Sequence, residues 1–97
     1  MSLSNNLKGY QIVFTKNANK DLNTINKNDT NSILKKLKSL VSGNDNIDTK
    51  KMSGSKKAYR LKHGDYRVIY EIYHKKIIVL VVKVGHRKNV YKRKTWE

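Results

Sequence analysis

Hydrophobic residues recur along this chain with two periods, one near two residues and one between three and four. A run at residues 10–14 is rich in β-forming side chains and predicts a first strand. Apolar residues then repeat at helical spacing over residues 16–25, and Thr15 can cap a helix that begins at Lys16. The N-terminal quarter therefore predicts a strand followed by a helix.

A second helix is predicted after a turn at residues 26–29, with Asp29 or Thr30 as its cap. Its single apolar stripe consists of Ile33, Leu34, Leu37, Leu40 and Val41. Gly43 follows where a helix C-terminal glycine is typical. Two short helices separated by a few residues predict an antiparallel helical hairpin.

Residues 43–57 are expected to form a polar loop, and alternating apolar runs follow it. Three antiparallel strands are predicted at 58–62, 66–73 and 76–84. Between the first two, Gly64-Asp65 gives a tight turn of the kind that type II′ hairpins prefer. The order β-α-α-β-β-β predicts an α+β fold, with the helical hairpin packed on one face of a small, mainly antiparallel four-stranded sheet. We expect one domain over residues 1–97, with residues 1–8 flexible.

Side-chain alternation assigns the strand residues to the two faces of this sheet. Arg60, Lys62 and Arg67 share one face, and the other face receives Tyr59, Leu61, Val68, Tyr70 and Ile72. On the last strand we expect Ile78, Leu80, Val82 and Val84 beneath the helices, and Ile77, Val79, Val81, Lys83 and Arg87 on the uncovered side. In the hairpin register Lys62 lies opposite Arg67. Like charges directly across a ladder destabilise a sheet, so this pair indicates a site for an anion.

The overall charge supports the same idea. Twenty-two Lys and Arg stand against seven Asp and Glu, a formal net charge of +15. This excess attracts polyanions and favours nucleic acid over a membrane surface or an acidic protein, with a merely solvated Lys-rich surface as the alternative. No cysteine is present, which excludes disulfides and thiolate metal sites. The longest apolar run, residues 77–82, is too short to span a bilayer, and with no secretory signal the predicted location is cytoplasmic.

Residues 59–91 carry the motifs of a known family. The core Y-R-L-K-x-G-x-Y-R-V-x-Y-x-I and the closing V-G-H-R-K-x-V-Y resemble the RelE/ParE toxin superfamily, on the RelE side. The leading strand and the helical hairpin extend the resemblance over nearly the whole chain. It implies a toxin of a type II toxin–antitoxin pair, of which RelE-like members cut messenger RNA in the ribosomal A site. It also implies a cognate antitoxin that wraps the toxin and keeps it inactive.

Carried over position by position, the resemblance places basic catalytic residues at Arg60, Lys62, Arg67 and Arg87, and an aromatic residue at Tyr91. In RNA the 2′-hydroxyl can attack the adjacent phosphate, which requires a base and charge stabilisation but no metal or other cofactor. We take Lys62 as the base, because a guanidinium stays protonated whereas neighbouring cations disfavour a charged lysine. Arg60 and Arg67 would hold phosphate oxygens, Arg87 would stabilise the phosphorane or the leaving oxygen, and Tyr91 would stack on a base.

Each assignment has a structural alternative. The first hairpin strand can be a solvated surface for ribosomal RNA, Arg67 can pair with Glu71, and Tyr91 can pack on the sheet edge. His86 is a further catalytic candidate, as a general acid, or simply a turn residue. Additional contacts to RNA or the ribosome are expected from Lys50, Lys51, Lys56, Lys57, Lys83 and Lys88.

The leading hypothesis is therefore a ribosome-dependent endoribonuclease toxin. A ParE-like inhibitor of DNA gyrase on the same fold is the first alternative, and an inactive homologue that binds nucleic acid is the second. The opposed cations favour the nuclease, because a gyrase inhibitor has no need for them. The expected partners are an antitoxin, messenger RNA and the ribosome, with a toxin–antitoxin hetero-oligomer on operator DNA and no membrane.

Overall fold

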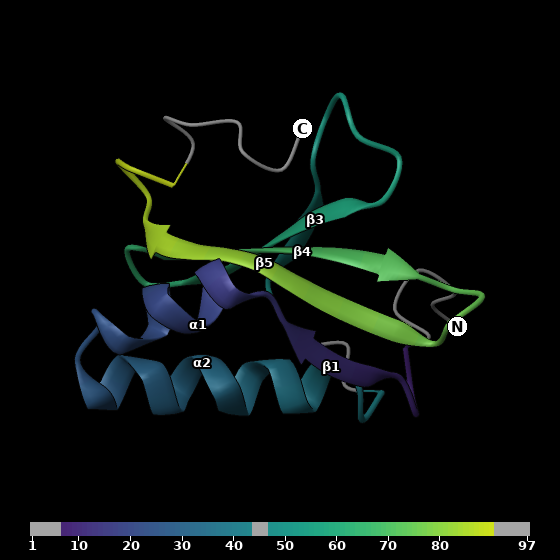
Figure 1. Ribbon diagram of the computed structural model, residues 1–97, viewed down its shortest axis with the longest axis horizontal. Helices are drawn as coiled ribbons and strands as arrows, with labels where there is room; N and C mark the ends of the chain where they lie inside the picture. The colour runs from purple at the N-terminus through teal and green to yellow at the C-terminus, as the bar shows by residue number, and fades with distance from the viewer. Residues whose placement is uncertain (1–6, 44–46, 91–97) are drawn as a thin grey trace.

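The computed structural model describes residues 7–43 and 47–90. Its elements are β1 (Gln11–Phe14), α1 (Lys16–Asn23), α2 (Lys27–Leu40), β2 (Thr49–Lys51), β3 (Ala58–His63), β4 (Tyr66–Tyr73) and β5 (Ile78–His86). The strands form one sheet in the order β1-β5-β4-β3-β2, with β1 parallel to β5 and the other pairs antiparallel. Both helices lie on the same side of this sheet (Figure 1). The predicted α+β class and helical hairpin are confirmed, although the sheet has five strands and not four.

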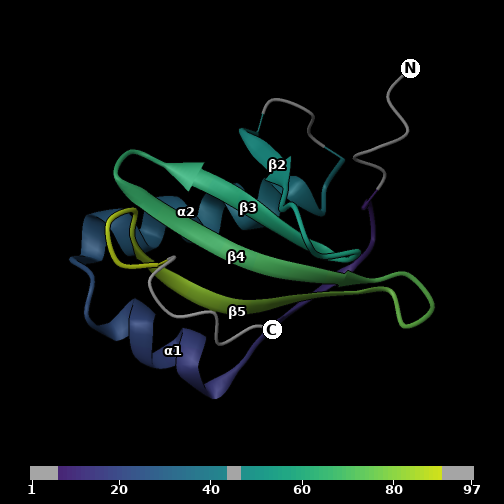
Figure 2. The same ribbon diagram turned by 90° about the horizontal axis from the view of Figure 1, so that it is seen from above.

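The additional strand, β2, lies inside the polar loop that was expected at residues 43–57. It pairs with β3 through Thr49↔Leu61, Lys50↔Arg60 and Lys51↔Tyr59. The Met52 N–H donates to the Ala58 carbonyl at 2.9 Å and closes the connection. Seen from above, β2 extends the sheet on the side opposite β5 (Figure 2). This strand places Lys50 directly opposite Arg60.

Both helices begin at side-chain caps. Thr15 caps α1 as predicted, and its hydroxyl accepts the Ala18 N–H at 3.1 Å. The prediction for α2 was wrong, because Asn26 is the cap and not Asp29 or Thr30. Asn26 Oδ1 accepts the Asp29 N–H at 2.9 Å, and Asn26 Nδ2 donates to Asp29 Oδ2 at 2.7 Å. Asp29 thus lies in the first helical turn, where a carboxylate is favourable.

A β-bulge in β5 determines which residues of that strand reach the core. Ile69 lies opposite Lys83, but the next residue, Tyr70, lies opposite Val81. Val82 is therefore the extra residue of the bulge, and the alternation of side chains reverses there. The strand also runs from residue 78 to 86, later than the predicted 76–84.

The predicted faces of β5 were consequently wrong before the bulge and correct after it. Val79 and Val81 were expected on the uncovered face, but both are fully buried in the helix-side core together with Val84. Ile78 and Leu80 were expected beneath the helices, and they instead line an open hollow on the other side. Ile77, predicted in the strand, lies in the preceding turn and is half exposed.

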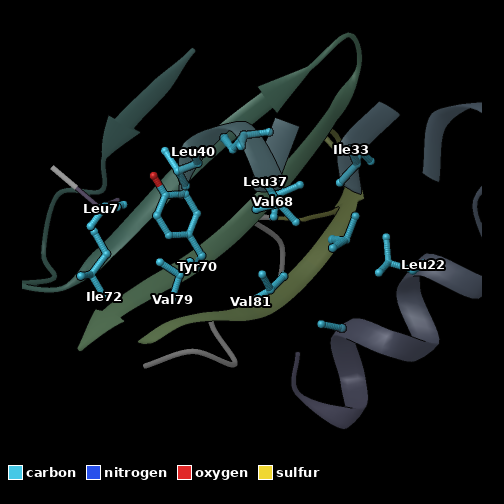
Figure 3. Close-up of a cluster of buried hydrophobic side chains, with 13 residues drawn as sticks. Leu7, Leu22, Ile33, Leu37, Leu40, Val68, Tyr70, Ile72, Val79 and Val81 are labelled. Carbon is cyan, nitrogen blue, oxygen red and sulfur yellow. The ribbon is translucent and has the colours of Figure 1, made fainter. Parts of the chain in front are cut away.

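The core lies between the helices and the sheet (Figure 3). The apolar residues that the helices contribute are Ala18, Leu22, Ile33, Leu37 and Leu40. The sheet contributes Leu61, Val68, Tyr70 and Ile72, as predicted, besides the three valines of β5. Tyr70 is the largest fully buried side chain, and burial raises its pKa to about 12. One face of the sheet thus packs against the helices.

No helix in the described ranges is long and apolar enough to cross a bilayer.

Candidate nucleic-acid interface

The side of the sheet opposite the helices carries a set of basic side chains, which we call the cationic face. It consists of Lys50, Arg60, Lys62, Arg67 and Lys83. Two pairs of like charge lie directly across the ladder, Lys50 opposite Arg60 and Lys62 opposite Arg67. Cross-strand pairs of this kind are unfavourable in an isolated sheet. The second pair confirms the predicted hairpin register, and the first was not foreseen because β2 was not.

The Lys50–Arg60 pair borders a hollow. Lys50, Lys51, Met52, Ser53 and Arg60 line this open space of about 290 Å³. The Arg60 side chain is about four-fifths buried, and its Nη1 lies 3.5 Å from a carboxylate oxygen of Asp48. That carboxylate is well exposed, so the ion pair is weak and replaceable.

The Lys62–Arg67 pair lies nearer the hairpin turn. Arg67 Nη1 donates to the carbonyls of Gly64 at 2.9 Å and Tyr66 at 3.0 Å, which hold the guanidinium towards the turn. Lys62 is exposed, and in the described ranges no carboxylate oxygen lies within 4.0 Å of its Nζ or of the Arg67 guanidinium. Within residues 7–43 and 47–90, this pair therefore presents two positive charges that no neighbouring carboxylate compensates.

Glu71, the alternative partner of Arg67, is bonded elsewhere. It is buried, and the Tyr73 hydroxyl donates to Oε1 of its carboxylate at 2.6 Å. Lys57 Nζ lies 4.6 Å from the centre of the Tyr73 ring, and the hydrogen bond with Tyr73 raises the pKa of Lys57. Lys57, predicted to contact RNA, is thus held against an aromatic ring in the free protein.

Arg87 is fixed to the same end of the sheet as Arg67. Its backbone N–H donates to the Asp65 carbonyl at 2.7 Å, and its Nε lies 3.7 Å from Asp65 Oδ1. The turn that joins β3 to β4 therefore anchors the residue that follows β5. Tyr91, the predicted aromatic partner, lies outside the described residues.

His86 is not brought together with the cationic face. It lies opposite Tyr66, with ring centres 6.1 Å apart, and Tyr66 packs against the helix-side core. Cross-strand neighbours share a face, so His86 points to the helix side of the sheet. Its Nδ1 accepts the Lys88 N–H at 3.1 Å, which suits the alternative role as a turn residue.

The remaining predicted contact residues are dispersed. Lys83 lies on the cationic face beside the fully buried Ile69, with its Nζ 4.0 Å from Asp21 Oδ2. The same oxygen accepts the Val84 N–H at 3.0 Å, so Asp21 caps the free edge of β5. Three other predicted lysines are exposed outside the cationic face, namely Lys51, Lys56 and Lys88.

One contact next to the site was not anticipated from the sequence. His63 Nε2 lies 3.1 Å from Asp29 Oδ1 and links the β3–β4 hairpin to the start of α2. Hydrogen bonds from Asn26 and His63 lower the pKa of Asp29 below its usual value. His63 Nδ1 is buried and has no hydrogen-bond partner in the described part of the chain. The two residues are 34 positions apart, and no periodic pattern relates them.

Metal ligation is not a feature of the described ranges, where no group of three or more His, Asp or Glu side chains could hold an ion. The chemistry available at the cationic face is that of ammonium and guanidinium groups. Lysine can exchange a proton, and arginine binds phosphate oxygens through two parallel hydrogen bonds. A helical hairpin under a five-stranded sheet, with facing cations on the other side, defines a small α+β domain with a surface suited to a polyanion.

Comparison with known proteins gives this domain a family. The family described as the ParE toxin of the type II toxin–antitoxin system parDE matches residues 12–91. A RelE-like toxin protein of Escherichia coli is 31% identical over 81 residues, which cover 81% of this chain and 84% of the relative. The chain therefore belongs to the ParE toxin family and is a RelE-like toxin within it, as its motifs predicted.

Solved structures agree with this assignment. A chain of the RelB–RelE antitoxin–toxin complex of Methanococcus jannaschii superposes with a TM-score of 0.70 at 27% identity, over 81% of this chain and 94% of that one. A chain of the archaeal RelE–RelB complex of Pyrococcus horikoshii gives 0.69 at 26% identity, over 84% and 98%. The isolated RelE toxin of Escherichia coli gives 0.71 at 22% identity, over 91% and 92%, and so supports the fold alone.

Proposed function

We propose that this RelE-like toxin is a ribosome-dependent endoribonuclease that cuts messenger RNA in the A site and thereby stops translation. The observation that carries the proposal is the Lys62–Arg67 pair, in which two cations face each other without a carboxylate partner in the described ranges. Arg87 lies at the same end of the sheet, with its Nε 3.7 Å from the exposed carboxylate of Asp65. A phosphodiester in the transition state of its own cleavage carries extra negative charge, which such a cluster stabilises.

The reaction that suits these groups uses the 2′-hydroxyl of RNA as nucleophile. Lys62, in its neutral form, takes the proton of that hydroxyl while the oxygen attacks phosphorus. The bond from phosphorus to the 5′-oxygen breaks, which leaves a 2′,3′-cyclic phosphate and a 5′-oxygen that takes a proton from solvent, and Lys62 then returns its proton to solvent. Arg67 holds the non-bridging oxygens, and Arg87 stabilises the phosphorane or the leaving oxygen. Tyr91 stacks on a base of the codon.

Lys62 is the best base among these groups because of the chemistry of its side chain. A guanidinium does not release its proton in proteins, which excludes the arginines, whereas a lysine amine can exchange a proton. His86 is the weaker candidate, because it points to the other side of the sheet.

We further propose a cognate antitoxin that covers the cationic face. The neighbouring solved structures include RelE chains in complex with RelB. An acidic or amphipathic segment would neutralise the opposed cations, and the resulting hetero-oligomer is expected to bind operator DNA. The toxin would act in the cytoplasm, where ribosomes are available.

Inhibition of DNA gyrase remains the second candidate, because the matching family is described as that of ParE. The two activities leave different products. On induction, the nuclease causes translation arrest with cut messages, whereas the gyrase inhibitor causes DNA breaks and an SOS response. The facing cations favour the first, since a protein-binding inhibitor does not require them. Growth without arrest would indicate an inactive nucleic-acid-binding homologue.

The decisive experiment maps the 5′ ends of a defined message on purified ribosomes, with and without the toxin. We expect cuts at one position within the codon in the A site. Lys62→Ala and Arg67→Ala should each slow cutting by roughly 10²–10⁴-fold, the usual contribution of such groups. Lys35→Ala, on the exposed side of α2, removes one charge without touching the site and serves as control.

Two results would contradict the proposal in different ways. Absence of cuts, together with loss of gyrase supercoiling activity, would replace the nuclease by the gyrase inhibitor. If Lys62→Ala keeps the full cutting rate while Arg67→Ala does not, the nuclease stands and another group is the base.

A further inference from the structure

We propose that Lys50 and Arg60 form a second phosphate subsite, which binds the phosphodiester next to the one that is cut. The inference rests on the proposed function, since it assumes that the RNA strand is cut at the Lys62–Arg67 pair. It concerns residues on β2 and β3, one strand away from the hairpin turn. It also gives Arg60 a role in positioning the RNA, separate from the phosphate that reacts.

The two cation pairs lie at separate places on the sheet. Arg60 and Lys62 are neighbours on one face of β3, but their partners lie on opposite sides of that strand. Arg60 faces Lys50 on β2, whereas Lys62 faces Arg67 on β4. The residue opposite Arg60 on β4 is Ile69, which is fully buried and carries no charge. The two pairs are therefore separate sites, and each supplies two cations.

Their separation suits neighbouring phosphates. Two residues along a strand span about 6.6 Å, and one strand to the side adds about 4.8 Å, so the centres of the pairs lie about 8 Å apart. Consecutive phosphates of an extended RNA strand have a comparable spacing. A single strand that crosses β3 obliquely would thus meet one cation pair with each of two consecutive phosphates.

The hollow at Lys50 and Arg60 is lined by groups that can bind a phosphate. Its lining includes the Ser53 side chain, a hydroxyl that can donate to a phosphate oxygen, besides the two cations. Arg60 Nη1 already lies 3.5 Å from the Asp48 carboxylate, which is more than half exposed. The carboxylate occupies the position of an anion, and a phosphate can replace it at little cost.

The test is a cycle of protein and RNA changes on the full chain. The RNA carries a 2′-O-methyl group at the cut nucleotide, so it cannot react. A neutral methylphosphonate replaces the phosphate on one or the other side of the reactive one. Affinity is measured by fluorescence anisotropy at low salt, for the wild-type protein and for Lys50→Ala/Arg60→Gln. Lys35→Ala is the matched control, and thermal unfolding verifies that each variant is folded.

For the wild type we expect one methylphosphonate position to weaken binding several-fold. For Lys50→Ala/Arg60→Gln the all-phosphate RNA should bind more weakly, and the methylphosphonate should cost nothing further. The slope of log affinity against log salt should fall by about 1, as for one lost phosphate contact. Asp48→Asn should bind more tightly, because it removes the carboxylate that competes with the phosphate.

The proposal is overturned if, at both positions, methylphosphonate substitution weakens binding to the double variant as much as it weakens binding to the wild type. It is also overturned if Asp48→Asn does not bind the RNA more tightly than the wild type. On ribosomes, loss of the subsite should raise the toxin concentration that is needed for half-maximal cutting. A binding cycle that shows coupling without any cutting on ribosomes would refute the nuclease but keep the subsite. Cutting on ribosomes without coupling in the binding cycle would refute the subsite but keep the nuclease.

Discussion

The facing cations lead to an unusual expectation, namely that Lys62→Gln stabilises the fold while it strongly slows cutting. Lys62 is exposed and lies directly opposite Arg67. Two unit charges about 7 Å apart repel by roughly 0.6 kcal/mol in water and roughly 2.4 kcal/mol at an effective dielectric constant of 20. Favourable cross-strand pairs, including pairs of opposite charge, contribute about 0.2–1 kcal/mol on sheets, and we take the same scale for the repulsion of like charges. Since Lys62 is exposed, we expect a gain of about 0.5–1 kcal/mol in the free energy of unfolding.

Urea unfolding at two salt concentrations tests this expectation. The gain should be largest at roughly 0.01 M salt and nearly vanish at roughly 1 M, where the Debye length has fallen from about 30 to about 3 Å. Lys51→Gln is the control, because Lys51 is equally exposed but faces Tyr59 across the ladder. A gain no larger than that of Lys51→Gln, or one that persists at high salt, would show that the pair is not repulsive.

Three further expectations concern the fold. In urea unfolding, Val81→Ala should lower the free energy of unfolding by about 2–3 kcal/mol and Leu80→Ala by less than about 1 kcal/mol, because the bulge buries only Val81. Equal losses for the two variants would contradict the observed register. The lowered pKa of Asp29 adds stability that is complete above pH 3.8 and lost as pH falls through its folded value, so acid unfolding of Asp29→Asn should depend less on pH. Tyr70 has its pKa raised to about 12, so stability falls as pH rises from 10 to 12 by up to about 3 kcal/mol; Tyr70→Phe should remove that part of the loss in alkaline unfolding.

Local patterns sufficed for much of this fold. The helical hairpin follows from two apolar stripes, and the β3–β4 register follows from alternation around Gly64-Asp65. Both depend on residues close in the chain. The strand β2 could not be found in this way, because Thr49–Lys51 has no apolar residue and is defined only by its pairing with β3.

The bulge in β5 was hidden for a different reason. Residues 77–82 are all apolar, so the sequence has no polar position that marks the solvent side. The register of β5 is determined by two hydrogen bonds from a residue distant in the sequence. The Thr15 N–H donates to the Val81 carbonyl at 3.0 Å, and its hydroxyl donates to the Val82 carbonyl at 3.3 Å, where the chain leaves β1 for α1. After the bulge the polar residues return, and the predicted side for Lys83 is correct.

The two faces of the sheet affect stability in opposite directions. On the helix side, burial of aliphatic residues stabilises the strands whichever ligand is present. On the other side, the like charges of the Lys50–Arg60 and Lys62–Arg67 pairs oppose strand pairing, and only the first pair has a nearby carboxylate, that of Asp48, in the described ranges. An anion that binds there gains its own contacts and also relieves that repulsion, so binding and folding are linked. In the proposed function, RNA and an acidic antitoxin segment would satisfy the same charges, so we expect them to compete for one surface. The sheet tolerates its unfavourable pairs because five strands and a packed core hold the cations in place before any ligand arrives.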